Sequence, residues 1–415
     1  MKTPRTAVAE ILEHTTRRPT ERISLTDALD RVLAEDVSSP IDLPPWDNSA
    51  MDGYAVRTHD LPPMPPVELE IIEEIPAGTF PQKPLEAGQC ARIFTGAPVP
   101  KGADGVIRQE DTTRLDEGRV RINDLRDGGR NVRPAGEDVR NGSMVLAAGS
   151  LIGPSEQGLL ASVAAFDVSV YRRPIVAILG SGDEIAEAHE RDAVLAGRKI
   201  ASSNTYTLVS LVHRAGGIAR NLGVAKDDPD ELRHRLLEAK GADFVITTGG
   251  VSVGEHDFLH EVLQALDVDQ KFWKIRMRPG APVAFGVVGQ LGGIPWLGLP
   301  GNPVSTMVTF ELFARPAIRK MQGLTKLFRD VTSVSVGDPI SLGPPLRHFL
   351  RVRLSDDGVV PAVQLTGAQG SGLLTSMVQA DALLVVPEDL TEVQTGEVLE
   401  AIVLEDHRHV AECPW

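Results

Sequence analysis

Three short segments of the chain place glycine beside small polar residues, a combination that suits the binding of an anion. They are GSGDE (180–184), TTGGVSVG (247–254) and LPGNPVS (299–305), and each follows or ends an apolar run typical of a buried strand. Glycine lets the backbone approach a ligand closely, and free N–H groups at the start of a following helix favour negative charge. None of the three matches the P-loop or the dinucleotide fingerprint, so neither of those nucleotide sites is expected. A tight turn without a ligand is the alternative for each loop taken alone.

The second and third loops supply a set of candidate ligand-binding residues. Asn302 is placed to cap a helix whose first residue is Pro303, because Asn at the N-cap and Pro at the next position are both favoured. The candidates are Gly249, Gly250, Ser252, Pro300, Asn302 and Ser305.

Three carboxylates lie close to these loops in the sequence or follow another predicted strand. They are Glu184, Asp227 and Asp257. Asp228 has a structural explanation as the N-cap of a helix that begins at Pro229, so Asp227 is the acid left without one. For each acid alone, a solvated or capping role is the ordinary alternative. Because Mg²⁺ binds a few carboxylates together with phosphate oxygens and water, the common position of the three acids at strand ends indicates a Mg²⁺ site.

Positive charge is concentrated in FWKIRMRPGAP (272–282), which contains Lys274, Arg276 and Arg278. Interpreted as a strand, this segment puts the three side chains on one face, since successive side chains alternate. That face suits a clamp for a phosphate or another oxyanion, and a solvated edge strand remains the alternative. Arg133 is a similar candidate.

The segment LPPWDNSAMDGYAVR (43–57) holds a further acid, Asp52, after a rigid start of two prolines and a tryptophan. Gly53 follows it and would let the backbone approach a ligand. The composition fits an ordinary surface loop and also a loop that delivers one carboxylate to a ligand. The pattern alone leaves both interpretations open.

These residues need a framework, and the apolar runs predict a multidomain α/β protein. Residues 41 to about 140 alternate short apolar runs with turn signals, which is typical of β-rich structure. From 174 to about 326, short strands alternate with helices, for example over 229–239 and 302–321. This alternation predicts a mostly parallel sheet with helices on both faces, and ligands bind such sheets at the carboxyl ends of the strands. After about residue 327, short strands return and predict a small β domain.

The composition excludes several classes of protein. The chain has 415 residues and a net charge of −15, which argues against nucleic-acid and anionic-membrane partners because both favour basic surfaces. Its two cysteines, Cys90 and Cys413, are too few for a disulfide framework or a cysteine-rich zinc site. The amphipathic N-terminus lacks a signal-peptide core, and no window of 18 apolar residues could span a membrane. A cytoplasmic protein is therefore expected.

Eight motifs, in order along the chain, resemble the molybdopterin molybdenumtransferases, a family related to the C-terminal domain of gephyrin. They are PPWDNSAMDGYAVR, ARIFTGAPVP, NVRPAGED, GSGDE, TTGGVSVGEHDF, the segment from FWK to PG, LPGNPVS and TGAQGS. The similarity extends over roughly residues 5 to 405. Eight ordered motifs over that length are far more specific than any single glycine loop.

The resemblance implies an elongated four-domain homodimer with its active site at the subunit interface. A linking domain would comprise residues 1–40 and 140–173, with a β-rich domain, 41–139, inserted into it. A three-layer α/β domain would follow over 174–326, and a small C-terminal β-barrel over 327–415. Asp52 would then act in trans, beside the other acids of the partner chain.

The reaction implied by the resemblance starts from adenylylated molybdopterin. Its pyrophosphate bond is hydrolysed with the help of Mg²⁺, molybdate is inserted at the dithiolene, and AMP and molybdenum cofactor leave. The family's functional acids map to Asp52, Glu184, Asp227 and Asp257, the last three as metal ligands. Substrate-binding positions map to Thr95, Arg133, Lys274, Arg278, Arg351 and Ser371. Contacts with the molybdopterin adenylyltransferase and with molybdoenzymes are further expectations.

Two positions depart from the pattern of the family. Lysine is usual where Arg278 and Ala281 stand, so one charge changes its geometry and another is lost. A divergent paralogue that inserts tungstate is therefore an alternative, as is a molybdopterin-binding scaffold with little turnover. An adenylyltransferase acting on molybdopterin is a third, which the β-rich insertion and the NSAMDGY motif disfavour.

Overall fold

The computed structural model describes residues 1–250, 258–343, 345–355 and 360–404. The chain forms two compact units. The larger unit comprises Met1–Glu21, Asp30–Ala34 and Val170–Trp415, and the smaller unit comprises Arg22–Leu29 and Glu35–Ser169. This division does not separate the four domains predicted above, so their boundaries remain a prediction.

A six-stranded sheet forms the centre of the α/β part of the larger unit. Its order is β16 (Ile218–Ala225), β13 (Ile175–Ser181), β17 (Phe244–Thr248), β21 (Ile294–Leu299), β20 (Ala284–Val288) and β18 (Val268–Trp273). The first four strands are parallel, β20 runs antiparallel to β21, and the edge strand β18 runs antiparallel to β20. The mostly parallel sheet predicted from the sequence is confirmed.

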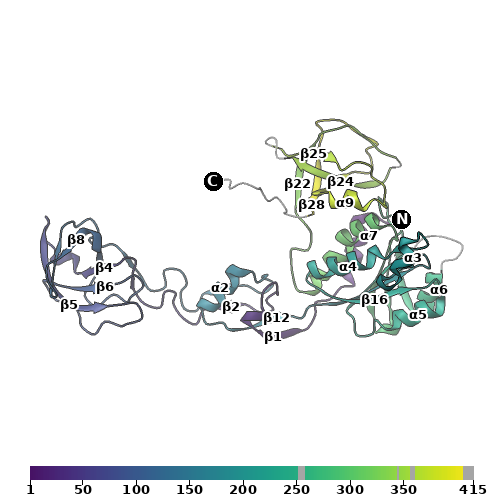
Figure 1. Cartoon of the computed structure of the whole chain (residues 1–415). Coiled ribbons are helices and arrows are strands. Elements are labelled where there is room, and N and C mark those ends of the chain that lie inside the picture. The colour runs from purple at the N-terminus through teal and green to yellow at the C-terminus, as the bar shows by residue number, and fades with distance from the viewer. Residues whose placement is uncertain (251–257, 344, 356–359, 405–415) are drawn as a thin grey trace. The chain divides into compact units, whose positions relative to one another are not determined.

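Helices cover both faces of this sheet (Figure 1). They are α1 (Pro4–Glu13), α4 (Ser203–Arg214) and the 303–321 helix on one face, and α5 (Pro229–Leu237) and α6 (Phe258–Ala265) on the other. Strand β13 shows why both layers form: Val176 and Ile178 enter the first apolar cluster, whereas Ala177 and Leu179 enter the second. Full burial of an aliphatic side chain of this size contributes about 1.5–3 kcal/mol, so a strand that is apolar on both faces requires two covering layers.

The long helix predicted over 302–321 is continuous but not uniformly α-helical. It consists of α7 (Pro303–Thr309), a π-helical turn (Phe310–Ala314) and α8 (Arg315–Met321). Pro316 explains the wide turn, because proline has no N–H to donate and its ring crowds the carbonyl four residues earlier. Within the described residues, none of the helices has the length and hydrophobicity that a membrane span requires.

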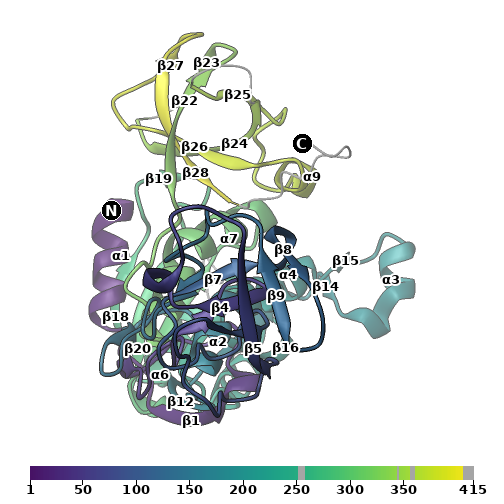
Figure 2. The ribbon, with the colours of Figure 1, turned by 90° about the vertical axis from the view of Figure 1, so that its left-hand side faces the viewer.

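The C-terminal part of the larger unit is a closed five-stranded barrel, as predicted (Figure 2). Its strands are β24 (Arg347–Ser355), β25 (Ala362–Leu365), β22 (Val331–Val336), β28 (Val398–Val403) and β26 (Ala382–Val386), and β26 pairs again with β24. Val334, Val352 and Leu384 fill its interior. Outside the barrel wall, α9 (Leu374–Val378) packs against α7.

The smaller unit is built mainly from β-strands, as the sequence predicts. Its main sheet has the order β7 (Gly105–Arg108), β4 (Gly53–Val56), β6 (Gln89–Ile93), β5 (Val67–Ile75), β9 (Arg119–Ile122) and β8 (Thr112–Arg114). Short pairs add to it: β3 (Asn48–Ser49) with β10 (Val132–Arg133), and β2 (Val37–Ser38) with β11 (Met144–Leu146). The helix α2 (Pro154–Ser162) also belongs to this unit.

Candidate active site

The three glycine loops meet at one edge of the α/β sheet. Strands β13, β17 and β21 are neighbours and parallel, so their carboxyl ends lie side by side. The N–H of Gly249 donates to the carbonyl of Leu299 at 3.3 Å. A Cβ on Gly249 would lie 2.7 Å from the carbonyl oxygen of Ser181, and its φ is +92°. Only glycine fits there, because all three loops converge on this position.

Side chains tie the second and third loops together. The Thr248 hydroxyl donates to the carbonyl of Pro300 at 3.0 Å, and Thr306 donates to the same carbonyl at 2.6 Å. Asn204 donates through Nδ2 to Thr248 Oγ1 at 2.9 Å and to the carbonyl of Gly301 at 2.7 Å. Asn204 is not among the residues predicted from the sequence, because an Asn in the first turn of a helix carries no spacing signal that relates it to loops far along the chain.

Two of the predicted acids of the larger unit, Glu184 and Asp227, lie in two facing loops. The Asp183 N–H donates to Asp227 Oδ2 at 3.4 Å, and the Asp227 N–H donates to Asp183 Oδ1 at 3.3 Å. The carboxylate of Glu184 folds back towards Gly182, where an added Cβ would lie 2.7 Å from Oε2. Asp228 caps α5 by accepting from the Glu231 N–H at 2.8 Å, as predicted.

Two predicted site residues, Ser252 and Asp257, lie outside the described residues. Among the residues that are described, no group of three His, Cys, Asp or Glu side chains is arranged to hold a metal ion. Of the three predicted metal ligands, Glu184 and Asp227 lie in adjoining loops, and Asp257 lies outside the described residues.

The prediction that Lys274, Arg276 and Arg278 share one face of one strand is wrong. Strand β18 ends at Trp273, and Lys274 has a φ of +89°, which no regular strand allows. The chain leaves the sheet at that point, and β19 (Met277–Arg278) pairs with β24 of the barrel. The three cations therefore lie on a connection between the sheet and the barrel, where Arg276 and Arg278 are exposed.

The N-terminus of α7 is partly occupied by the barrel. Asn302 stands at the N-cap position, but its side chain makes no capping hydrogen bond. The N–H of Val304 donates to the carbonyl of Ser371 at 3.0 Å. Ser305 is 3% exposed. One of the helix N–H groups expected to be free for an anion is thus already paired, and Ser371 is placed beside the third loop.

Arg351 lies on β24, between two residues of the barrel interior, so its side chain points outward, where it holds the loop that carries Ser371. It is 0% exposed; its Nε donates to Ser376 Oγ at 3.0 Å, and its Nη2 donates to the carbonyl of Gly370 at 3.0 Å. Within the described part of the chain, its Nη1 is buried and has no hydrogen-bond partner. Burial lowers the pKa of this guanidinium below its ordinary value.

In the smaller unit, Asp52 is anchored by Thr95. Its Oδ1 accepts from the Thr95 N–H at 2.8 Å and from the Thr95 hydroxyl at 2.7 Å. The backbone hydrogen bond, then the hydroxyl, and then the charge of Arg92 lower the pKa of Asp52. The carboxylate is therefore ionised and oriented at neutral pH.

Three motif segments of the smaller unit pack together around this acid. The Ser49 N–H donates to the carbonyl of Ala97 at 3.0 Å, and the Ala50 N–H donates to the carbonyl of Asn131 at 2.8 Å. Strand β3 pairs with β10, which carries the exposed Arg133. Asp52, Thr95 and Arg133 therefore come from segments that contact one another.

Gly53 has a packing role that its sequence context does not predict. A Cβ at this position would collide with the carbonyl oxygen of Ile107 on β7. The glycine is required for the close approach of β4 to β7, so the expectation that it serves the approach of a ligand is not needed to explain it.

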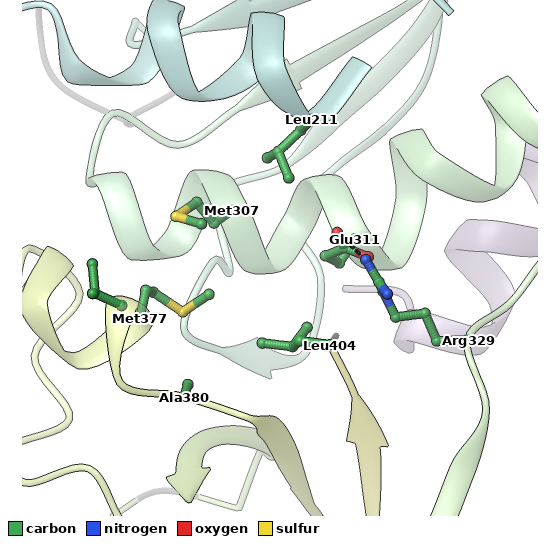
Figure 3. A pocket seen from close by; sticks show the side chains of 8 residues that line it. Leu211, Met307, Glu311, Arg329, Met377, Ala380 and Leu404 are labelled. Carbon is green, nitrogen blue, oxygen red and sulfur yellow. Dashed lines mark hydrogen bonds and ion pairs between the residues drawn. The ribbon is translucent and has the colours of Figure 1, made fainter. Parts of the chain in front are cut away.

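A pocket of about 300 Å³ lies elsewhere in the larger unit, between α4, the 303–321 helix and the barrel (Figure 3). It is lined by Leu211, Met307, Glu311, Arg329, Met377, Val378, Ala380 and Leu404. Arg329 donates two hydrogen bonds to Glu311, at 2.7 and 3.1 Å, so the two charges in the lining neutralise each other. None of the predicted site residues lines this pocket, and its remaining walls are apolar.

Comparison with protein families covers nearly the whole chain. The MoeA N-terminal region (domains I and II) matches residues 3–164, a probable molybdopterin-binding domain matches 177–320, and the MoeA C-terminal region (domain IV) matches 333–404. A molybdopterin molybdenumtransferase of Nostoc sp. is 38% identical over 92% of this chain and 88% of its own length. One of Haemophilus influenzae is 35% identical over 94% of this chain and 95% of its own.

A solved structure agrees with this result. The molybdopterin biosynthesis MoeA protein of Pyrococcus horikoshii is 30% identical and matches with a TM-score of 0.80 over 97% of this chain and 99% of that chain. The sequence relatives, the family models and the fold all agree, and the chain therefore belongs to the MoeA family.

Proposed function

We propose that the chain is a molybdopterin molybdenumtransferase that hydrolyses the pyrophosphate bond of adenylylated molybdopterin and inserts molybdate into the dithiolene. AMP and molybdenum cofactor are the products. Similarity to transferases of that name over more than nine-tenths of the chain supports the activity. The structural observation that carries it is the meeting of three glycine loops at the carboxyl edge of one parallel sheet.

The second and third loops are the proposed binding site for the phosphates. Gly249 and Gly250 have positive φ values and bring backbone close to the edge of the sheet. Pro300, Asn302 and Ser305 bring the start of α7 to the same edge. A helix N-terminus and glycine backbone together favour a phosphate, even with the Val304 N–H already paired.

Cations on the connection between the sheet and the barrel are the proposed molybdate site. Molybdate is a substrate oxyanion and needs donors and positive charge. Lys274 and Arg278 lie on that connection, and Arg351 and Ser371 lie in the neighbouring barrel. The buried Nη1 of Arg351 is a donor without a partner among the described residues, which suits an oxyanion.

Glu184 and Asp227 are the proposed Mg²⁺ ligands, together with Asp257. Hard carboxylate oxygens suit this ion, and one or two carboxylates plus substrate phosphate oxygens are its usual ligands. The contact between the loop of Asp183 and Glu184 and the loop of Asp227 supports this assignment. Bound there, Mg²⁺ would neutralise charge on the phosphates.

Asp52, Thr95 and Arg133 are proposed to complete the site from the partner subunit of a homodimer. An ionised, oriented carboxylate can orient water or a protonated group without rearranging first. The support is the anchoring of Asp52 by Thr95 and the resemblance of its motif to the family. Contacts with molybdopterin adenylyltransferase and molybdoenzymes, and a cytoplasmic location, belong to the same proposal.

The direct test supplies adenylylated molybdopterin, molybdate and Mg²⁺ to the purified chain and follows AMP release and cofactor formation. AMP release that requires both the metal and the oxyanion is the expected result. No AMP under any metal condition would overturn the proposal, and ATP consumption with free molybdopterin would instead identify an adenylyltransferase. Tungstate replacing molybdate with equal or better rates would identify the tungstate alternative.

Subunit mixing tests the dimer. An Asp52→Ala chain and an Asp227→Ala chain are each expected to be inactive alone. Unfolded and refolded together, they should regain about a quarter of the wild-type rate per subunit, because half of the dimers are mixed and each has one intact site. A mixture that stays inactive, although gel filtration shows dimers, would place Asp52 in the same site as the acids of its own chain or remove it from the site.

A further inference from the structure

Asn204 makes a side-chain contact with two ligand loops at once. It lies in the first turn of α4, and its Nδ2 donates to Thr248 Oγ1 at 2.9 Å and to the Gly301 carbonyl at 2.7 Å. Thr248 is the last residue of β17, and Gly301 lies just after β21. One amide therefore joins the two loops, whose residues lie 53 positions apart in the chain.

The orientation of this amide is fixed by its partners. The Gly301 carbonyl can only accept, so it must face Nδ2 and not Oδ1. The Thr248 hydroxyl donates to the Pro300 carbonyl at 3.0 Å, so its oxygen is left to accept from Asn204. Both N–H groups of the amide are then used, and a flipped amide would set two acceptors against each other.

Asn204 is not needed to hold its own helix. Leu208 and Val212 anchor α4 in the apolar cluster, and both are 0% exposed. The Oδ1 of Asn204 is buried and has no hydrogen-bond partner among the described residues. A buried acceptor without a donor is unfavourable, so the amide oxygen does not account for Asn at this position. The donated hydrogen bonds are the reason for Asn at this position.

We infer that Asn204 is a positioning residue that sets the spacing between the second and third glycine loops for the phosphates of the substrate. The inference rests on the proposed function. Asn204 acts through the Thr248 hydroxyl and the Gly301 backbone. If the amide is lost, Gly301 and the start of α7 are free to shift relative to Gly249. Misplacement by about 1 Å is enough to cost up to about 100-fold in a preorganised site.

Two variants test this, with a matched control. Asn204→Asp keeps the shape but replaces both donated bonds with repulsion between the carboxylate and the Gly301 carbonyl. Asn204→Ala removes the bonds without adding charge, which covers the case in which the Asp variant fails to fold. Asn221→Asp makes the same chemical change at an exposed residue of β16, where Oδ1 can still accept from the Gly223 N–H.

The expected result is a KM for adenylylated molybdopterin that rises about tenfold in both Asn204 variants. We expect kcat to change less than about threefold and the melting temperature to fall by less than about 2 °C. The Asn221→Asp variant should match the wild type. An unchanged KM, or a lower melting temperature with KM and kcat unaffected below it, would show that Asn204 is only structural.

A second readout separates this inference from the proposed function. Equilibrium binding of AMP is measured by calorimetry on the wild type and on Asn204→Ala. If the wild type shows no turnover, the proposed function fails, yet an AMP affinity about tenfold weaker in the variant still supports a positioning role at a phosphate site. Equal AMP affinity in the two proteins overturns the inference whether or not the wild type turns over.

Discussion

Two regions of the molecule hold acids that the sequence assigns to the site, and they hold them differently. In the smaller unit, Asp52 Oδ1 accepts two hydrogen bonds from Thr95, one from its backbone and one from its hydroxyl. In the larger unit, Asp183 and Asp227 face each other through long contacts of 3.4 and 3.3 Å, from backbone N–H groups to carboxylates. Glu184, next in the chain, folds back onto Gly182.

The difference indicates different roles for Asp52 and for the acids of the larger unit. Asp52 is oriented by its own unit before any ligand arrives, and its lowered pKa keeps it charged. In the described part of the chain, Asp183 and Asp227 accept only these long backbone hydrogen bonds, so their carboxylates are less firmly held than that of Asp52. Under the proposed function, Asp52 would act as a fixed charge, and Glu184 and Asp227 would bind a cation.

Asp52→Asn gives the largest expected effect. The amide oxygen can still accept from Thr95, so the loop keeps its shape while the charge is lost. AMP release should fall by about 100-fold or more, the size of a lost catalytic carboxylate. The measurement is the single-turnover rate of AMP formation, with circular dichroism to verify folding.

Asp47→Asn is the matched control for this variant. Asp47 lies in the same segment, and its Oδ1 accepts from the Ala135 N–H at 2.7 Å. An asparagine oxygen can keep that bond, so the rate should stay within about threefold of the wild type. Equal losses in the two variants would mean that the segment, and not the Asp52 charge, determines the rate.

Asp227→Asn should have the second largest effect, and one that depends on metal. With one proposed ligand neutralised, the Mg²⁺ concentration for half-maximal rate should rise about tenfold, as for other weakened metal sites. Raising Mg²⁺ should restore much of the rate here but none of it in Asp52→Asn. Metal titrations of both variants make this test. Rescue of both, or of neither, would remove the distinction between the fixed charge and the metal ligands.

The sequence predicted the framework well, because the framework follows from local pattern. Apolar runs like that of β13, which is buried on both faces, recur along the chain, as do turn signals between short strands. Both can be recognised in the sequence without a structure. The meeting of the three loops also follows from pattern, since neighbouring parallel strands end at one edge.

The failures have physical causes that no local pattern carries. The segment after Trp273 keeps an alternation of buried and exposed residues, yet the left-handed Lys274 takes it out of the sheet and towards the barrel. The sequence around Gly53 suggests a glycine that lets a ligand approach. The glycine is instead required because a Cβ there would collide with the carbonyl oxygen of Ile107. Asn204 depends on partners 44 and 97 residues away. Each depends on tertiary contact, which spacing does not encode.

Thr95→Val tests how much of the anchoring of Asp52 comes from the hydroxyl. The backbone N–H bond remains, so the rate at neutral pH should fall only about threefold, the value of one hydrogen bond. The pKa of Asp52 should rise towards its ordinary value, and the acid limb of the kcat/KM profile should move to higher pH. Thr95→Ser, which keeps a hydroxyl, is the control.

The pH dependence of folding stability should reflect the same lowered pKa of Asp52. A lowered carboxyl pKa stabilises the folded state above the pKa of an unfolded aspartate, and this contribution is lost as pH falls through the folded pKa. Thr95→Val should therefore lose stability at neutral pH and approach the wild type in acid, as followed by urea unfolding. A loss that is equal at all pH values would mean that the hydroxyl acts through packing and not through the charge of Asp52.

Arg278→Lys is the smallest change expected and tests the opposite case, an exposed charge without rigid anchoring. Arg278 is exposed on β19, and lysine keeps the charge but not the planar fork of donors. The molybdate concentration for half-maximal AMP release should change by only about twofold, because exposed charges are screened by solvent and salt. Arg278→Gln should raise it several-fold at low salt and less at high salt. If Arg278→Gln leaves the molybdate dependence unchanged, the cation lies outside the oxyanion site, and the buried Arg351 becomes the guanidinium to which the molybdate proposal must be confined.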